Sequence, residues 1–316
     1  MLHISQKQAF ANRRIHRSPG DVCFDLINVL LLTVFTLICV FPFYYLFINT
    51  ISDNALSARG LITLFPKGVH FENYIQIFKI SGILTAAIVS LARTVIGTTL
   101  SVFASAFLGY LLTKQNMIGH KLVYRFIVVT MYFNAGVIPW YINMMNLHLL
   151  NNFLVYILPT IVAPYSIILV KTYVESIPSA LEDAAQMDGA GYMARFAWVI
   201  LPVCLPILAT ITIFSAVGQW NSFQDTLFLI SDKRLYTLQF LLYRYMNEAE
   251  ALATIIKTAE SSEMLANMTI TQTPTSIKMT VSMIVVLPIL LVYPYFQKYF
   301  VKGIMILSLI HISEPT

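Results

Sequence analysis

The chain has 316 residues, of which 58% are hydrophobic and only 11% are charged. Because a soluble domain carries about 25% charged residues, this composition excludes a water-soluble globule. The net charge of +5 comes from Lys and Arg beside apolar blocks, a pattern that sets membrane orientation, so we expect no nucleic-acid partner.

Six apolar stretches are each long enough to cross a bilayer as a helix, for which about 20 residues are needed. In chain order they are residues 22–48, 82–112, 124–144, 153–173, 198–230 and 277–296. The sequence therefore predicts an all-α, polytopic membrane helix bundle with six transmembrane helices in contact with lipid. The first stretch is too long for a signal peptide and ends in aromatic residues, so we expect a retained helix.

The basic residues near the span ends predict the orientation of the chain. Cations are more frequent in the tail over 1–21, in the connections after spans two and four, and after span six than in the opposite loops. The bias is mild, but together with an even number of spans it places both termini in the cytoplasm. The connections 49–81 and 231–276 are then outer loops.

The cytoplasmic segment over 175–198 has the local signals of a short helix, a turn and a second helix. Ser179 and Glu182 have the spacing of a capping box, and the acids Glu182 and Asp183 suit the first turn of a helix. Gly189 supplies a stop, since glycine tolerates the left-handed conformation of a helix end, and a second helix is expected from Gly191. Such a segment is either a docking surface for another protein or an ordinary amphipathic connector.

The same segment resembles the EAA signature of ABC-importer permeases, E-A-A-x3-G-x9-I-x-L-P. The match runs through Asp183-Ala184-Ala185, then Gly189, then Val199-Ile200-Leu201-Pro202. Asp183 stands for the glutamate and Val199 for the isoleucine, while Glu182 keeps a second acid beside them. Asp188-Gly189-Ala190 is also similar to the D-G-A of carbohydrate members.

The resemblance extends over nearly the whole chain. Further segments that are similar to LplC/YtcP-type sugar permeases, on the MalG side of maltose-type importers, are 43–45, 52–53, 132–136, 169–173, 218–221 and 299–303. The resemblance implies a MetI-like ABC permease fold, a transmembrane permease domain over 22–306 and a place in the bacterial cytoplasmic membrane. Residues 307–316 depart from the family and resemble a translated sequencing-adapter read, so we expect a non-native tail.

The function implied by the resemblance is that of the permease subunit of an importer for a sugar or oligosaccharide. The implied partners are a second permease subunit in a heterodimer, a cytoplasmic ABC ATPase dimer and an extracytoplasmic solute-binding protein. ATP and Mg would be bound by the ATPase, so the chain itself is expected to hold no cofactor and no metal and to catalyse no reaction. The residues expected to couple it to the ATPase are Glu182, Asp183, Ala184, Ala185, Asp188, Gly189, Ala190, Leu201 and Pro202.

Polar residues inside the spans are the candidates for a solute path. Arg93 lies within span two, where a charge has to face protein or water; it either lines that path or pairs with Asp225 or a backbone carbonyl. Amides and an indole suit the hydroxyls and apolar faces of sugars, although interhelical hydrogen bonding is the alternative. The candidates are Arg93, Asn134, Gln219, Trp220, Asn221 and Asp225.

Three other function classes are less consistent with the sequence. It contains no G-x-x-x-x-G-K-[ST], no H-E-x-x-H and no G-x-S-x-G, so neither ATP hydrolysis nor these hydrolase chemistries are expected. Its three cysteines, Cys23, Cys39 and Cys204, form no CxxC pair. A permease for a non-carbohydrate solute, a secondary transporter working alone and an integral-membrane enzyme stay as alternatives.

Overall fold

The computed structural model describes residues 19–292 except 80–81, 259–272 and 274, together with residue 294. All regular structure in this part of the chain is helical, which confirms the all-α prediction. Most of the predicted N-terminal tail, the far end of span six and the expected non-native tail over 307–316 lie outside the described residues.

Three helices are long and apolar enough to cross a membrane without interruption. They are α2 (Pro19–Thr50), α5 (Ile83–Leu111) and the last described helix, Thr275–Val292. Two bent pairs pass the same test of length and composition, so the described residues hold up to five candidate spans. These five correspond to predicted spans one, two, four, five and six.

Prolines lie at the bends of the two bent pairs. In the first pair, Phe153–Thr160 and α8 (Pro164–Glu175) meet at 42°. In the second, Tyr192–Val203 and α12 (Leu205–Asn221) meet at 80°. Pro164 and Pro206 stand in the first turns of α8 and α12, where the missing backbone donor costs little, but a proline ring cannot continue a preceding helix without a kink.

Predicted span three differs from the structure, because residues 124–144 do not form one helix. The chain forms α6 (His120–Tyr132), an irregular stretch and then α7 (Val137–Asn146). Gly136 has φ +84°, which no right-handed helix accommodates. Asn134 Oδ1 accepts a hydrogen bond from the Gly136 N–H at 2.9 Å and stabilises the break.

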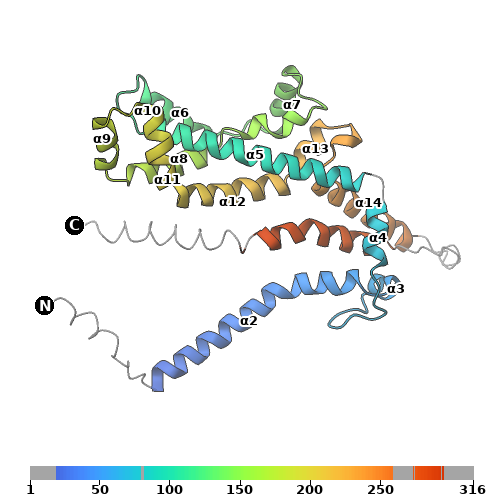
Figure 1. The fold of residues 1–316 in the computed structure, drawn as a ribbon. Coiled ribbons are helices and arrows are strands. Elements are labelled where there is room, and N and C mark those ends of the chain that lie inside the picture. Colours follow the sequence, from blue (N-terminus) through green and yellow to red (C-terminus); the bar gives the residue numbers. More distant parts are fainter. Residues whose placement is uncertain (1–18, 80–81, 259–272, 274, 293, 295–316) are drawn as a thin grey trace.

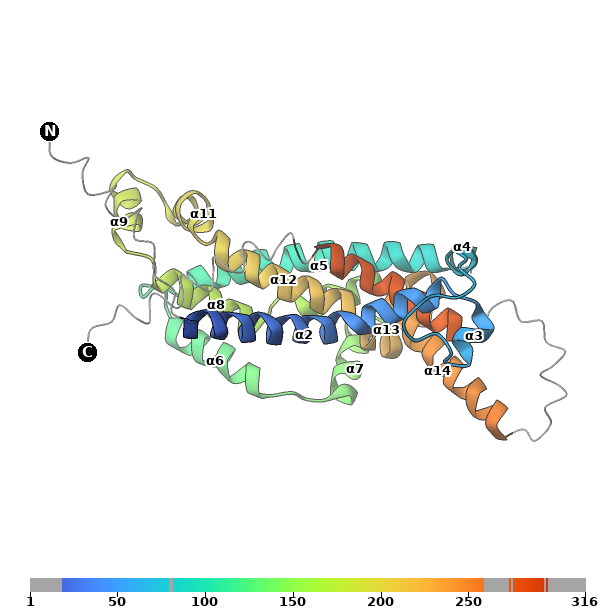
Figure 2. The same ribbon diagram turned by 90° about the horizontal axis from the view of Figure 1, so that it is seen from below.

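The bundle is built around α5, which runs beside α12 and α8 (Figures 1 and 2). Small residues allow the close approach, as is usual between membrane helices. A Cβ atom at Gly109 would lie 2.8 Å from Val170 Cγ1 and 3.1 Å from the carbonyl oxygen of Ile167, both on α8. The glycine is therefore required by the packing of α5 on α8.

Gly109→Ala is expected to destabilise the bundle by about 1–3 kcal/mol, because the added methyl group overpacks the α5–α8 contact. Gly218→Ala is the matched control, since a Cβ there meets nothing within 4 Å and alanine is a better helix former than glycine. Thermal unfolding of the two purified variants would measure the difference. Equal melting temperatures would contradict the close packing of α5 on α8.

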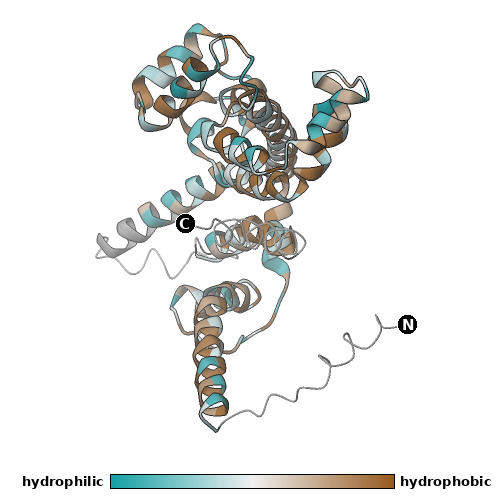
Figure 3. Ribbon diagram, turned by 90° about the vertical axis from the view of Figure 1, so that its left-hand side faces the viewer, coloured by the Kyte–Doolittle hydropathy of each residue, from teal (hydrophilic) through white to brown (hydrophobic). Residues whose placement is uncertain are grey.

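The first long helix, α2, stands apart from this bundle (Figure 1). Its only buried residues are Ile48, Asn49 and Thr50 at its C-terminal end, where the Asn73 side chain donates to the Thr50 carbonyl at 2.9 Å. Apolar residues predominate along the long helices in Figure 3. The exposed apolar length of α2 has to be covered by lipid or by another membrane subunit.

Candidate functional site

The predicted helix, glycine turn and second helix are present in the segment over 175–198. Helix α9 (Ala180–Met187) is terminated by the turn at Gly189, which has φ +82°, and α10 (Tyr192–Ala194) follows with Gly191 as its N-cap. The Gly189 N–H donates to the Gln186 carbonyl at 3.0 Å and the Ala190 N–H donates to the Ala185 carbonyl at 2.9 Å. This pair of bonds is a Schellman motif, and it fixes the direction in which the chain leaves α9.

The predicted capping box does not form. Ser179 itself has helical backbone angles, and its side chain makes no capping hydrogen bond. Glu182 turns instead toward the C-terminal end of α5, where Tyr110 Oη donates to its Oε1 at 2.8 Å and the Lys114 ammonium binds both carboxylate oxygens. A charged partner makes a stronger hydrogen bond than a backbone N–H, which explains the outcome.

Glu182 belongs to a group of side chains that we call the α9 clamp: Tyr110, Lys114, Glu182, Gln186 and Arg195. Arg195 is buried, with Nη1 3.5 Å from Glu182 Oε1 and donating to Gln186 Oε1 at 2.8 Å. The Lys114 ammonium also lies 4.2 Å from the centre of the Tyr110 ring. The clamp fastens α9 to α5 and to the π-helical turn η3 (Arg195–Ile200) that opens bent span five.

The clamp lowers the pKa of Glu182. Burial alone would raise it, but hydrogen bonds from Lys114 and Tyr110 and the positive charges of Lys114 and Arg195 outweigh that effect. Because the folded-state pKa lies below its ordinary value of 4.5, the carboxylate stabilises the docking of α9 at every pH above that value. This stabilisation is lost as the pH falls through the folded-state pKa.

Amide protection in α9 is therefore expected to be constant between about pH 8 and pH 5 and to fall only below the ordinary glutamate pKa. Hydrogen exchange followed by mass spectrometry would measure it, after correction for the intrinsic exchange rate. Glu182→Gln should lower the protection at neutral pH and remove the acid dependence. Glu175→Gln, which changes an exposed i,i+4 pair with Lys171, should behave like the wild type; identical profiles for both variants would refute the clamp.

The side of α9 that faces away from the clamp is exposed. Met187 is 88% exposed and Leu181 is 46% exposed. Among the predicted coupling residues, Asp183, Ala184, Asp188, Gly189 and Pro202 are exposed, Ala185, Ala190 and Leu201 are half-buried, and Glu182 is half-buried in the clamp. Leu201 and Pro202 lie on α11 (Leu201–Val203), at the bend of span five.

A second polar cluster lies inside the membrane bundle around Arg93, which is 1% exposed. Its guanidinium group pairs with Asp225 Oδ2 at 2.6 Å and donates to the Ser222 carbonyl at 3.1 Å and to Gln219 Oε1 at 3.2 Å. The ring of Tyr156 lies 4.5 Å away. Arg93 was expected either to line a solute path or to pair with Asp225 or a backbone carbonyl. In the structure it pairs with both Asp225 and the Ser222 carbonyl.

The other candidates for a solute path have separate environments. Gln219 is buried and donates to Thr160 Oγ1 at 2.7 Å, so it joins α12 to span four. Trp220 donates to the Val285 carbonyl at 3.0 Å on the last described helix. Asn221 is exposed at the end of α12, and Asn134 is exposed in the break between α6 and α7.

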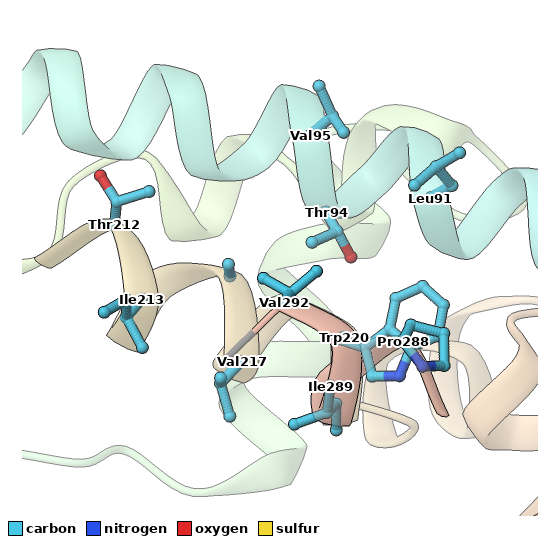
Figure 4. A pocket seen from close by; sticks show the side chains of 11 residues that line it. Leu91, Thr94, Val95, Thr212, Ile213, Val217, Trp220, Pro288, Ile289 and Val292 are labelled. Carbon is cyan, nitrogen blue, oxygen red and sulfur yellow. The ribbon is translucent and has the colours of Figure 1, made fainter. Parts of the chain in front are cut away.

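Trp220 lines an apolar cavity of about 230 Å³ between α5, α12 and the last described helix (Figure 4). The polar atoms of its wall are already bonded: Thr94 Oγ1 donates to the Ser90 carbonyl, Thr212 Oγ1 donates to the Leu208 carbonyl, and the indole is bound as above. Because these groups donate within the protein, the wall offers a hydroxyl-rich solute almost only apolar surface. Trp220 therefore lines an apolar cavity that the polar candidates for a solute path do not line.

Sequence reasoning missed Tyr110, Gln186 and the clamp role of Lys114 and Arg195. Lys114 and Glu182 are 68 residues apart, and no local spacing indicates a contact at that separation. The two cations were recognised only as orientation signals. Among the described residues, no group of three or more His, Cys, Asp or Glu side chains could hold a metal ion.

Comparison with known proteins agrees with this geometry. The family model described as "Binding-protein-dependent transport system inner membrane component" matches residues 101–306. Protein LplC of Bacillus subtilis (strain 168) is 31% identical over 292 residues, which are 92% of this chain and 96% of LplC. The polygalacturonan/rhamnogalacturonan transport system permease protein YtcP of the same organism is 32% identical over 280 residues, with 89% and 96% covered.

A solved structure has the same fold over most of its length. It is a chain of a bacterial ABC transporter involved in the import of the acidic polysaccharide alginate, with a TM-score of 0.77 and 29% sequence identity. The alignment covers 90% of this chain and 99% of that chain. The chain therefore has the MetI-like ABC permease fold and belongs to the family of inner-membrane components of binding-protein-dependent transport systems.

Proposed function

We propose that the chain is the permease subunit of an ABC importer that moves a sugar or oligosaccharide across the bacterial cytoplasmic membrane. The observation that carries this proposal is the α9 segment, which is exposed on one side and fastened to α5 and bent span five on the other. A separate ATPase dimer that grips the exposed side can then move the spans through the clamp. The chain itself binds no ATP and catalyses no reaction.

The contact with the ATPase involves the exposed side of α9 and the turn after it. Leu181 and Met187 supply apolar area, and the small side chain of Ala184 permits close approach. Asp183, Asp188, Gly189 and Ala190 complete this surface, while Ala185, Leu201 and Pro202 support it and Glu182 anchors it from behind. Closure of the ATPase dimer on ATP would favour one of two arrangements of the spans, which is the differential interaction that a population shift requires.

The exposed apolar surface of α2 supports the presence of a second permease subunit. A heterodimer would cover part of the apolar length of α2 that this chain leaves exposed, with lipid covering the rest. With α9 in the cytoplasm, and with α6 and α7 together crossing as the third of six spans, both termini lie there too. An extracytoplasmic solute-binding protein would deliver the solute to the outer side.

The substrate class is supported by the names of the relatives. They include transport permeases for polygalacturonan/rhamnogalacturonan and for arabinooligosaccharides, and the solved structure belongs to an alginate importer. A non-carbohydrate solute is the alternative, since the coupling segment by itself carries no information on the solute. A transporter that works without ATP is the second alternative.

The docking of the ATPase is tested by Met187→Glu. Because Met187 is 88% exposed, the substitution should leave folding unchanged while it places a charge in an apolar contact, and co-purification of the ATPase should fall at least tenfold. Ile118→Glu is the matched control, because Ile118 is 99% exposed in the same cytoplasmic region but lies outside α9. Equal co-purification with both variants would place the ATPase elsewhere.

Transport is tested with the assembled importer in proteoliposomes. Galacturonan oligomers, arabino-oligosaccharides and raffinose should be compared with a peptide, each with and without internal ATP. ATP-dependent uptake of at least one saccharide is expected. Uptake without ATP, or of the peptide alone, would overturn the proposed function.

A further inference from the structure

We propose that this chain itself contacts the saccharide, in a hollow formed where span three is broken; the inference rests on the proposed function. The hollow has a volume of about 830 Å³, within the usual range for ligand sites. It lies between the break with its flanking helices and α13 (Gln224–Leu229). Its walls contain Asn134 and Asp225 from the predicted solute path, together with Trp140, Asn143, Gln224 and Phe228.

The break itself favours a water-filled path on this side of the chain. Irregular backbone at membrane depth is stable only where it is buried in protein or lines an aqueous cavity, because lipid offers no hydrogen bonds. Residues 133–136 fall within the apolar stretch predicted as span three, and they are irregular and exposed. The hollow therefore faces either water or a partner subunit across a wet interface.

The lining has the chemistry of a site for sugar rings. Asn143 and Gln224 are exposed amides that can donate to and accept from hydroxyl groups. Trp140 and Phe228 supply apolar faces beside them. An acyl chain would leave the amides without partners in a dry environment, which makes lipid an unsuitable occupant.

The charge in the hollow favours contact with hydroxyl groups over contact with carboxylates. Among the described residues that line the hollow, Asp225 is the only charged one, and Arg93 and Ser222 both bind Asp225 through Oδ2. Arg93 therefore balances the charge of Asp225 from behind and fixes the carboxylate in place. Arg93 and Gln219 act as positioning residues, and the contact surface is made by the amides and aromatic rings.

The test uses the complete importer with its saccharide-loaded binding protein, in proteoliposomes. The probe is whichever of galacturonan oligomers, arabino-oligosaccharides and raffinose the wild type takes up fastest. Asn143→Leu and Gln224→Leu should each lower uptake per ATP hydrolysed by about tenfold or more. Asn146→Leu, three residues along the same helix and outside the hollow, should transport like the wild type.

Chemical protection separates contact from a structural role. In a background without Cys23, Cys39 and Cys204, Asn143→Cys should be shielded from a membrane-impermeant maleimide by the loaded binding protein and ATP, whereas Asn146→Cys should not. Wild-type uptake by Asn143→Leu and Gln224→Leu, or equal labelling at both cysteines, would overturn this site while leaving the proposed function intact. A wild type that takes up none of the three saccharides would overturn both.

Discussion

Gly189→Val is expected to reduce ATP-driven uptake by at least tenfold while the membrane bundle stays folded. Gly189 has φ +82°, a conformation that costs a residue with a Cβ about 1–2 kcal/mol and a β-branched one more. A Cβ there would meet nothing within 4 Å, so the effect comes from the backbone and not from crowding. Loss of the Schellman bonds would redirect the chain between α9 and α10 and misalign the surface offered to the ATPase.

Two further substitutions isolate this cause. Gly189→Asn should retain most of the uptake, because asparagine tolerates the left-handed region. Gly191→Ala should be silent, since Gly191 has φ −68° and open space around it. Uptake and co-purification of the ATPase would be measured in parallel. Wild-type uptake by the valine variant would remove the proposed role of the segment.

Arg93→Leu is expected to be the most destabilising single change in the membrane bundle. It removes three hydrogen bonds to α12 and the residues after it, and it leaves Asp225 without its counter-charge. Breaking a buried pair in this way costs about 3–5 kcal/mol, which corresponds to a fall in Tm of about 5–8 °C. Thermal unfolding in detergent would measure the change in Tm. Saccharide uptake should also fall, because Arg93 no longer holds the Asp225 carboxylate in place.

The size of the effect should depend on burial. Asp225→Asn should cost less, because Gln219 Oε1 and the Ser222 carbonyl still accept from Arg93. Arg234→Leu is the exposed counterpart: its pair with Asp232 has the Arg234 side chain 87% exposed, and exposed pairs add little to stability. Equal Tm values for Arg93→Leu and Arg234→Leu would contradict the stabilising role of the buried pair between Arg93 and Asp225.

The sequence by itself determined the elements whose causes are local. Apolar length fixed the positions of five of the six expected spans, because lipid selects for about 20 apolar residues in a helix. The spacing from Asp183 to Pro202 identified the family, and Gly189 marked the end of α9. The role of the coupling residues stays a prediction, as does the cytoplasmic position of both termini.

Only the tertiary structure decided where polar side chains find their partners. The Ser179–Glu182 spacing predicted a local capping box, but Lys114, 68 residues away, offers a stronger, charge-assisted bond. Likewise, apolar composition predicted one helix over 124–144, because hydropathy does not register a left-handed glycine with an asparagine that bonds to it. Arg93 was expected to need a partner, yet its choice of Asp225, Ser222 and Gln219 depends on the packing of α5 against α12. Once the fold brings distant residues together, each polar side chain bonds to the partner with the stronger and better aligned hydrogen bond. Local spacing in the sequence does not show which distant residues become such partners.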